Sequence, residues 1–300
     1  MRAENKVIVS VVMATYRRDE YLKKALNSLA AQEFRDFEIV LVDDNVDKEW
    51  NEKVSAIVSD FKNKNPEIKF CFAVNTENLG SAGTRNKGID IAEGKYVTFL
   101  DDDDEYLPEK LKNQVALMEE SSADFSVTDL SLYDNGGKLV DYRSRAYIKS
   151  FDNDDLLKAH IMYHLTGTDT FMFKREYIVA IGGFMPIDVG DEFYLMFKAI
   201  EYGGAFAYLP KCDVKAVVHS EDDGLSSGEK KIQGENAVYD FKKRYFGIFS
   251  RKELRYIKCR HYAVIAYANL RRKKIFRTLG YSIKGFFVSP YLFLKVLKSH

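Results

Sequence analysis

The first hundred residues alternate between continuous apolar runs and segments of helical periodicity, and this alternation limits the fold more than any other feature. The apolar runs have the length of strands and lie at residues 7–13, 38–42, 68–74 and 96–100. Between them, apolar residues recur three and four positions apart, as expected for helices at 19–32, 48–61 and 81–92. Such alternation predicts βαβ units and a mainly parallel sheet with helices on both faces.

The rest of the chain is less regular. We expect a strand at 124–134, a turn at Asn135-Gly136-Gly137 and a returning strand at 138–145. Helices are expected at 152–163 and 191–202, and the pattern beyond residue 230 is helical, aromatic and basic. The sequence therefore predicts an α/β domain over 1–228, with halves of about 1–110 and 111–228, followed by a helical extension over 229–300.

The charge of the chain is distributed unevenly. Residues 241–300 contain 16 Lys and Arg and one acid, Glu253, a net charge of +15, whereas residues 1–240 contain 29 basic and 44 acidic residues, a net charge of −15. Basic and aromatic residues interleaved on helices favour contact with an anionic membrane surface. No nucleic-acid-binding module is recognisable, so we expect no nucleic-acid partner. The alternative is a set of packing helices with a solvated basic face.

Targeting and cysteine patterns point to the cytoplasm. The apolar run at 7–13 is too short for a secretory signal, and no run of about 18 apolar residues would form a transmembrane helix. The chain has an odd number of cysteines, Cys71, Cys212 and Cys259, and no two of them have the spacing of metal ligands. We therefore expect neither a disulfide framework nor a zinc site.

Four adjacent carboxylates follow the fourth apolar run, in the segment FLDDDDEYLP at residues 99–108. Four like charges at a strand end repel one another, and a divalent cation would relieve the repulsion. Mg²⁺ and Mn²⁺ prefer carboxylate oxygen and bridge to substrate phosphates. The alternative is an acidic turn before a helix, for which one carboxylate would suffice.

Two further segments place polar groups at the same sheet edge. VLVDDN at 40–45 puts carboxylates just beyond a buried strand, where they could accept hydrogen bonds from a base or a ribose. NLGSAGTRNKGIDIAEG at 78–94 has glycines at a loop-to-helix junction, with Arg85 and Lys87 near the helix start. These cations could face a pyrophosphate, and the alternative is that the glycines serve close packing.

Taken in order, these segments resemble the inverting glycosyltransferase family 2, which has the GT-A fold. The resemblance rests on ATYRRDEYLKKALNSLAAQ after the first strand, VDDN after the second, and ENLGSAGTRNKGIDIAEGKYVTFLDDDD, and it covers about the first 110 residues. It implies that residues 1–110 bind a nucleotide sugar and residues 111–228 bind the acceptor. The implied reaction is sugar transfer from a nucleoside diphosphate donor with inversion at the anomeric carbon.

The resemblance also implies roles for individual residues. Thr15, Tyr16 and Arg17 would line the nucleobase pocket, and Asp43 or Asp44 would bind the base, usually uracil. Other donor-binding residues would be Arg85 near the pyrophosphate and Asp101 and Asp102 at ribose and sugar hydroxyls. Asn45-Val46 stands where the family usually has Gly-Ser, and Thr84 where it has Ala, so bases other than uracil stay open.

The same resemblance implies a metal site for Mg²⁺ or Mn²⁺. Asp103 would be the main ligand, in the motif Asp101-x-Asp103. His219 stands where family members often have a histidine, and it could bind the metal or touch the diphosphate. The alternative for His219 is a histidine in a surface loop.

The segment GDEFYLMFKA at 190–199 would supply the catalytic base. Aligning Lys198 with the arginine of the family pattern puts Asp191 at its glutamate and Glu192 at its aspartate, the proposed general base. Either carboxylate could take the proton of the acceptor hydroxyl. The alternative is a helix N-cap pair.

We expect an inverting glycosyltransferase that uses a UDP-sugar and a glycan or lipid-linked acceptor in cell-envelope polysaccharide synthesis. It would be cytoplasmic and peripheral on the inner face of the cell membrane. A nucleotidyltransferase is one alternative, but the segment ATYRR after the first strand lacks the glycine-rich loop of that class. A non-catalytic nucleotide-sugar-binding module is another, against which Asp191 and Glu192 argue.

Overall fold

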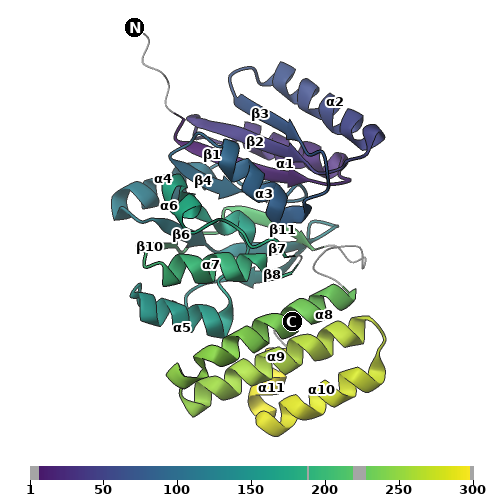
Figure 1. Cartoon of the computed structure of the whole chain (residues 1–300), viewed down its shortest axis with the longest axis vertical. Coiled ribbons are helices and arrows are strands. Elements are labelled where there is room, and N and C mark those ends of the chain that lie inside the picture. The colour runs from purple at the N-terminus through teal and green to yellow at the C-terminus, as the bar shows by residue number, and fades with distance from the viewer. Residues whose placement is uncertain (1–6, 188, 219–227, 298–300) are drawn as a thin grey trace.

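A computed structural model describes residues 7–187, 189–218 and 228–297. Its main sheet has seven strands in the order β10-β6-β9-β4-β1-β2-β3 (Figure 1). The strands are β1 Val9–Thr15, β2 Phe37–Asp43, β3 Lys69–Val74, β4 Tyr96–Phe99, β6 Phe125–Thr128, β9 Met172–Lys174 and β10 Phe206–Leu209. All neighbouring pairs are parallel except those of β9, which runs antiparallel to β4 and to β6. The predicted mainly parallel sheet is confirmed.

Helices cover both faces of this sheet, as predicted. On one face lie α1 Glu20–Ala30, α2 Lys48–Lys64 and α4 Lys110–Ser121, and on the other lie α3 Gly80–Ile91, α6 Arg175–Ala180 and α7 Asp191–Glu201. Strand β1 shows why both faces are apolar. Its Val11 and Met13 pack into the first layer, whereas Val12 packs into the second, because successive side chains of a strand point to opposite faces.

A second sheet of four strands lies beside the first, in the order β5-β11-β7-β8. Its strands are β5 Glu105–Tyr106, β11 Val214–Val218, β7 Leu130–Asp134 and β8 Leu139–Arg143. The single strand predicted at 124–134 is therefore wrong, because β6 and β7 belong to different sheets. Asp129 separates them: its buried carboxylate accepts hydrogen bonds from the hydroxyls of Tyr142 and Tyr208 and from the amide of Arg145. The predicted hairpin return is confirmed as β8.

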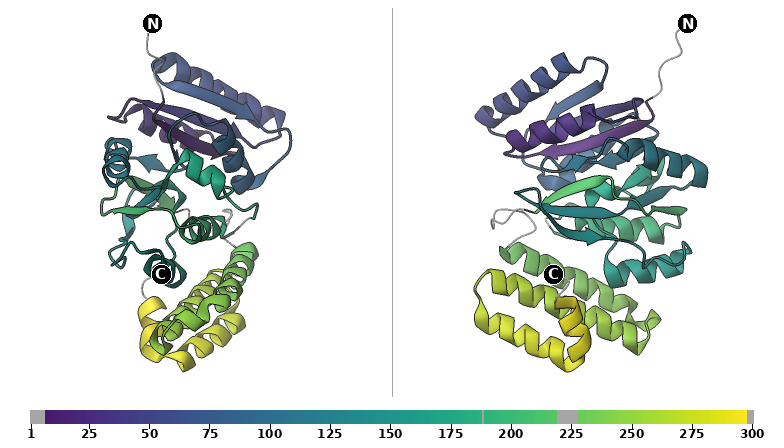
Figure 2. Two further views of the ribbon diagram at one scale, coloured as in Figure 1. Left: turned by 60° about the vertical axis from the view of Figure 1, so that its left-hand side comes forward. Right: turned by 180° about the vertical axis from the view of Figure 1, so that it is seen from behind.

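The chain ends in the predicted helical extension, formed by α8 Gly228–Lys242, α9 Arg251–Arg271, α10 Ile275–Val288 and α11 Pro290–Leu297. Helix α9 begins with a capping box between Ser250 and Glu253. The extension docks on α5, Asn153–Tyr163, where Ile161 and Met162 pack with residues of α8 and α9 (Figure 2). The boundary at residue 228 stays a prediction. Within the described residues, none of the helices combines the length and apolarity that a membrane span requires.

Helix α3 crosses β1 at a distance that only a glycine allows. A Cβ atom on Gly88 would lie 2.4 Å from Cγ1 of Val12 in β1. We therefore expect Gly88→Ala to lower the free energy of unfolding by about 1–3 kcal/mol, the range for an overpacked core. Urea denaturation would measure the change.

Gly280 in α10 provides the matched control, because a Cβ atom there would meet no other atom within 4 Å. Gly280→Ala should raise stability by about 0.5–1 kcal/mol, since alanine loses less backbone entropy in a helix. Equal effects of the two substitutions would show that the approach of α3 to β1 is not limiting.

Candidate active site

The segments that follow β1 and β4 meet at the carboxyl edge of the main sheet. The Oγ1 atom of Thr15 donates to Oδ2 of Asp102 at 2.7 Å, and the amide of Tyr16 donates to the same oxygen at 3.2 Å. Arg18 lies beside them, with its Nη2 atom 3.0 Å from Oδ2 of Asp103. Strands β1 and β4 are parallel neighbours, which is why residues some 85 positions apart share this edge.

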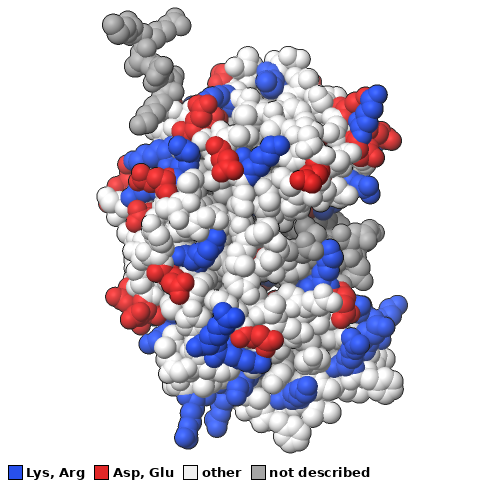
Figure 3. Space-filling model, in the orientation of Figure 1, with Lys and Arg blue, Asp and Glu red and all other residues white. Residues whose placement is uncertain are grey.

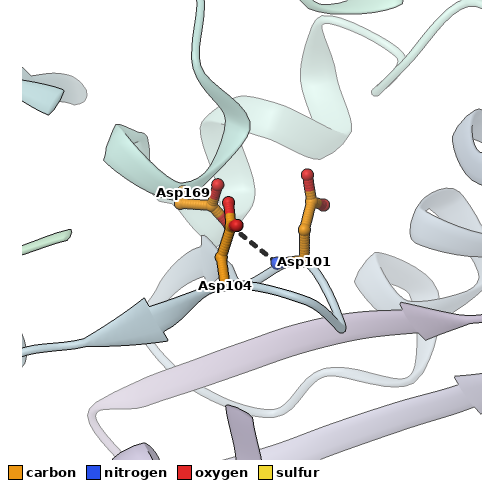
Figure 4. A group of neighbouring side chains, drawn as sticks. All are labelled: Asp101, Asp104 and Asp169. Carbon is orange, nitrogen blue, oxygen red and sulfur yellow. Dashed lines mark hydrogen bonds between the residues drawn. The ribbon is translucent and has the colours of Figure 1, made fainter. Parts of the chain in front are cut away.

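Three carboxylates lie close together at the acidic turn after β4 (Figure 4). Asp101 and Asp104 come from the turn, and Asp169 comes from a short 3₁₀ helix at Thr168–Thr170. One oxygen from each lies within 4.8 Å of the others. The amide of Asp101 donates to Oδ1 of Asp169 at 2.6 Å, and the amide of Val217 donates to Oδ1 of Asp104 at 2.8 Å.

Within this group Arg85 pairs with Asp101, whereas the carboxyl groups of Asp104 and Asp169 are buried. Burial, reinforced by the charge of Asp101, raises the pKa of Asp169 to about 7. Burial also raises the pKa of Asp104 well above its usual range, with Asp169 adding to the effect. The pKa of Asp102 rises to about 7 through burial and the neighbouring Asp103. The raised pKa values mean that these carboxyl groups ionise less readily than usual. A hard divalent cation bound to their oxygens would stabilise the ionised forms.

Arg85 links the acidic turn to the start of α7. Its Nη2 atom lies 2.6 Å from Oδ1 of Asp101, and its Nη1 atom lies 3.2 Å from Oδ2 of Asp191. The guanidinium is nearly buried and stands 5.4 Å from the ring centre of Phe184. A planar donor fork between two carboxylates fixes their relative position.

Two carboxylates occupy the first turn of α7 and point to different partners. Glu192 accepts hydrogen bonds from the amide of Gly167 and from Oγ1 of Thr168, both at 2.7 Å. It therefore anchors the loop that carries Asp169. Burial raises the pKa of Asp191 to about 6, against the opposing effect of Arg85. Of the two, Asp191 is the one joined through Arg85 to Asp101.

The two aspartates that end β2 differ in what they contact. Asp44 accepts hydrogen bonds from Nδ2 of Asn75 at 2.7 Å and from the amides of Leu79 at 2.8 Å and Gly80 at 3.0 Å. It thus holds the loop before α3. Asp43 accepts from the amide and side chain of Asn45 through Oδ1, and its Oδ2 atom is buried without a hydrogen-bond partner. Burial raises the pKa of Asp43.

A cavity of about 600 Å³ opens near the ends of β2 and β3, lined among others by Val46, Asn51, Phe72, Asn75 and Thr76. Its lining includes no residue of the acidic turn, so the cavity is separate from the carboxylate group. It shares Asn75 with the network around Asp44.

The structure brings six of the predicted site residues together. Thr15 and Tyr16 donate to Asp102, and Arg85 joins Asp101 to Asp191, so the two sets of contacts meet at the adjacent residues Asp101 and Asp102. Asp103 pairs with Arg18 and is not part of the three-carboxylate group, and Arg17 contacts Asn45 through its amide. His219 lies outside the described residues.

Three residues near the site were not predicted from the sequence. Arg18 and Asp169 contact the acidic turn directly. Lys110 is fully buried behind it, where its Nζ atom lies 3.3 Å from Oγ1 of Thr98 and burial lowers its pKa to about 7. Arg18 could have been found from its place beside the segment after β1. Asp169 and Lys110 carry no pattern in the sequence, since only folding brings them to the site.

Comparison with known proteins identifies the family. The family model for glycosyl transferase family 2 matches residues 10–189. An uncharacterized glycosyltransferase of Methanocaldococcus jannaschii, MJ1057, is 35% identical in a match of 213 residues that covers 65% of this chain and 71% of that protein. The putative teichuronic acid biosynthesis glycosyltransferase TuaG of Bacillus subtilis is 32% identical over 57% of this chain and 64% of its own length.

A third relative shares only part of its length with this chain. The GalNAc(5)-diNAcBac-PP-undecaprenol beta-1,3-glucosyltransferase of Campylobacter jejuni is 37% identical over 33% of this chain and 30% of its own length.

Solved structures show the same fold. S. aureus TarS 1–349 in complex with UDP-GlcNAc superposes with a TM-score of 0.61 at 20% identity, covering 97% of this chain and 91% of that one. The mannosyltransferase PcManGT of Pyrobaculum calidifontis, in complex with GDP-Man and Mn²⁺, superposes with a TM-score of 0.58 at 17% identity. The match covers 97% of this chain and 86% of that one. The sheet and its helices are those of a GT-A glycosyltransferase, and the chain belongs to glycosyl transferase family 2.

Proposed function

We propose that the protein transfers a sugar from a nucleoside diphosphate sugar, with UDP as the first candidate nucleotide, to a hydroxyl group of a glycan or lipid-linked acceptor with inversion. The observation that carries the proposal is the network Asp101–Arg85–Asp191. In this network the guanidinium of Arg85 lies between the acidic turn, which would bind the metal, and Asp191, the candidate base. The carboxylates on α7 argue against a binding module without catalysis, although Glu192 also anchors the loop that carries Asp169.

The donor nucleotide would bind at the ends of β1 and β2. Asp43 keeps a buried carboxylate oxygen without a partner, and an N–H or O–H group of a nucleobase or ribose would satisfy it. The exposed ring of Tyr16 offers a surface for base stacking. TarS in complex with UDP-GlcNAc supports uridine, whereas PcManGT in complex with GDP-Man keeps guanosine as the alternative.

Mg²⁺ or Mn²⁺ would be held by Asp101 and Asp103, with His219 as a further ligand. The fit rests on the carboxylate oxygens that the turn gathers at the end of β4, where Asp101 also lies close to Asp104 and Asp169. PcManGT was solved with Mn²⁺. When bound, the cation would neutralise the charge that develops on the departing diphosphate.

The carboxylates of α7 would take the proton of the acceptor. As the acceptor oxygen attacks the anomeric carbon, its proton passes to a carboxylate oxygen. The bond between that carbon and the diphosphate breaks on the opposite side, which inverts the configuration. We assign the proton transfer to Asp191, because its pKa of about 6 allows it to be ionised and still basic near neutral pH. Glu192 would hold the loop that carries Asp169.

The acceptor would be part of cell-envelope polysaccharide synthesis. The names of the relatives from B. subtilis and C. jejuni refer to teichuronic acid and to an undecaprenol-linked substrate, and they support a lipid-linked or polymeric acceptor. The protein would then act in the cytoplasm at the inner face of the cell membrane, held there by residues 241–300 with their net charge of +15.

A thermal-shift screen with nucleotide sugars and Mn²⁺ tests the donor assignment. A UDP-sugar at a hundred times its Kd should stabilise the fold by about 2.7 kcal/mol, because it binds only the native state. A GDP-sugar that raises Tm more would replace uridine with guanosine. If nucleoside triphosphates raise Tm and no nucleotide sugar does, the proposed reaction is wrong and a nucleotidyltransferase takes its place.

A further inference from the structure

Helix α10 lies at the edge of the molecule, at the opposite end from α2 (Figures 1 and 2). It exposes several large apolar side chains to solvent. The surface that they form, called here the α10 ridge, consists of Ile275, Phe276, Leu279, Ile283, Phe286 and Phe287, all exposed. Phe276 and Phe287 are 91% and 85% exposed. Their spacing of three, four and seven positions places all six on one side of the helix.

The ridge is not the face that the protein uses for its own packing. On the other side of α10, Gly285 is buried so closely against Phe293 of α11 that a Cβ atom would lie 2.2 Å from that ring. The ring of Tyr281 lies near that of Tyr262 of α9, with 6.3 Å between the ring centres and a tilt of 46° between the ring planes. The helix therefore has a packed inner face and a separate apolar outer face, and an exposed apolar surface of this kind marks a contact site.

The charges around the ridge select its partner. Residues 254–300 contain eleven Lys and Arg and no Asp or Glu. Lys273, Lys274 and Lys284 are exposed on α10 or just before it. In Figure 3 the charged side chains over the part formed by α8 to α11 are mostly basic, with a few acidic ones among them, including Glu229, which pairs with Arg272. A second copy docked ridge to ridge would bring like charges together. An anionic lipid surface offers both apolar chains and negative charge.

The structure also indicates which part of the basic stretch 241–300 would contact the membrane. The basic stretch 241–300 includes α9, but α9 is the central helix of the extension, with Cys259, Ala263 and Ile265 buried. Its exposed large apolar side chains are Tyr267 and Leu270, both near its end. The exposed apolar residues concentrate on α10 and continue to Tyr291 of α11.

We propose that the α10 ridge inserts into the interface of an anionic membrane, with Lys273, Lys274 and Lys284 contacting the lipid headgroups. This inference rests on the membrane contact proposed above and assigns it to specific side chains. It predicts two separable contributions: insertion of the two phenylalanines, which salt leaves unchanged, and attraction of the lysines, which salt screens.

Flotation of the full chain with vesicles tests the proposal. The protein should bind vesicles of phosphatidylglycerol and phosphatidylcholine, and bind much less to phosphatidylcholine alone. Phe276→Ser with Phe287→Ser should weaken binding to the anionic vesicles by at least about tenfold, since burying one such side chain is worth that much or more. Lys274→Gln with Lys284→Gln should weaken binding at low salt and have little effect at high salt.

The control removes two exposed apolar side chains outside the ridge, Val140→Ser with Val179→Ser, and should bind like the wild type. Thermal shift with nucleotide sugar and Mn²⁺ should be the same for all variants, which separates a failure of the ridge from a failure of the proposed donor chemistry. Wild-type binding by the phenylalanine variant would overturn the proposal. So would a wild-type dimer in sedimentation that becomes monomeric in that variant, because the ridge would then be a protein interface.

Discussion

Asp101→Asn is expected to reduce kcat/KM for sugar transfer by at least about a hundredfold, the scale seen when an enzyme loses one group that stabilises transition-state charge. The substitution removes the carboxylate that Arg85 contacts and that the proposed metal site shares with Asp103. The fold should survive, because the amide of Asp101 keeps its hydrogen bond to Asp169. Steady-state kinetics and far-ultraviolet circular dichroism would measure the two effects.

Companion variants identify the ligands. Asp103→Asn should lose Mn²⁺ binding in electron paramagnetic resonance together with turnover, whereas Asp60→Asn on the exposed surface of α2 should change neither. If Asp103→Asn keeps Mn²⁺ binding and Asp104→Asn loses it, the metal belongs to the buried group of Asp101, Asp104 and Asp169. Full activity of the wild type in excess chelator would exclude the metal from the reaction.

Asp191→Asn is expected to remove sugar transfer while leaving donor affinity almost unchanged, because the base acts on the acceptor. The pH dependence of kcat/KM tests the assignment of Asp191 as the base. Burial raises the pKa of Asp191 to about 6, so the ionised form that accepts a proton is lost as the pH falls through that value. With saturating Mn²⁺, which would keep the carboxyl groups of the acidic turn ionised, kcat/KM of the wild type should fall tenfold per pH unit below about pH 6 and should be level above it.

Glu192→Gln separates the two carboxylates of α7. If Glu192 only anchors Gly167 and Thr168, its variant should be slower but should keep the break near pH 6. Complete loss of turnover in Glu192→Gln, together with near-normal turnover in Asp191→Asn, would make Glu192 the base, as the family alignment places it. Near-normal turnover in both variants would mean that neither is the base.

The sequence predicts the parts of the fold that depend on local pattern. The strands and helices of the first hundred residues follow from apolar runs and helical spacing, and β8 follows from the turn at Asn135-Gly136-Gly137. The break between β6 and β7 could not be predicted, because Asp129 ends a strand through partners far along the chain, Tyr142 and Tyr208. Local sequence propensity does not indicate such long-range contacts.

The same limit applies to the site. Residues that end the first, second and fourth strands could be predicted to meet, since parallel strands align their carboxyl ends. The link from Arg85 to Asp191 spans 106 positions and depends on the placement of α3 and α7 on the same face of the main sheet. The different partners of Asp43 and Asp44 depend on the loop before α3, so adjacent and chemically identical residues could not be told apart from sequence.

Calorimetric titration of the donor selected by the thermal-shift screen tests the central claim most directly. With Mn²⁺ present, the nucleotide sugar should bind the wild type at one site per chain, and binding should be lost or greatly weakened in chelator and in Asp101→Asn. Asp191→Asn should bind the donor like the wild type. Donor binding that is equal in Mn²⁺ and in chelator, and unchanged by Asp101→Asn, would contradict a metal-assisted donor site at the acidic turn.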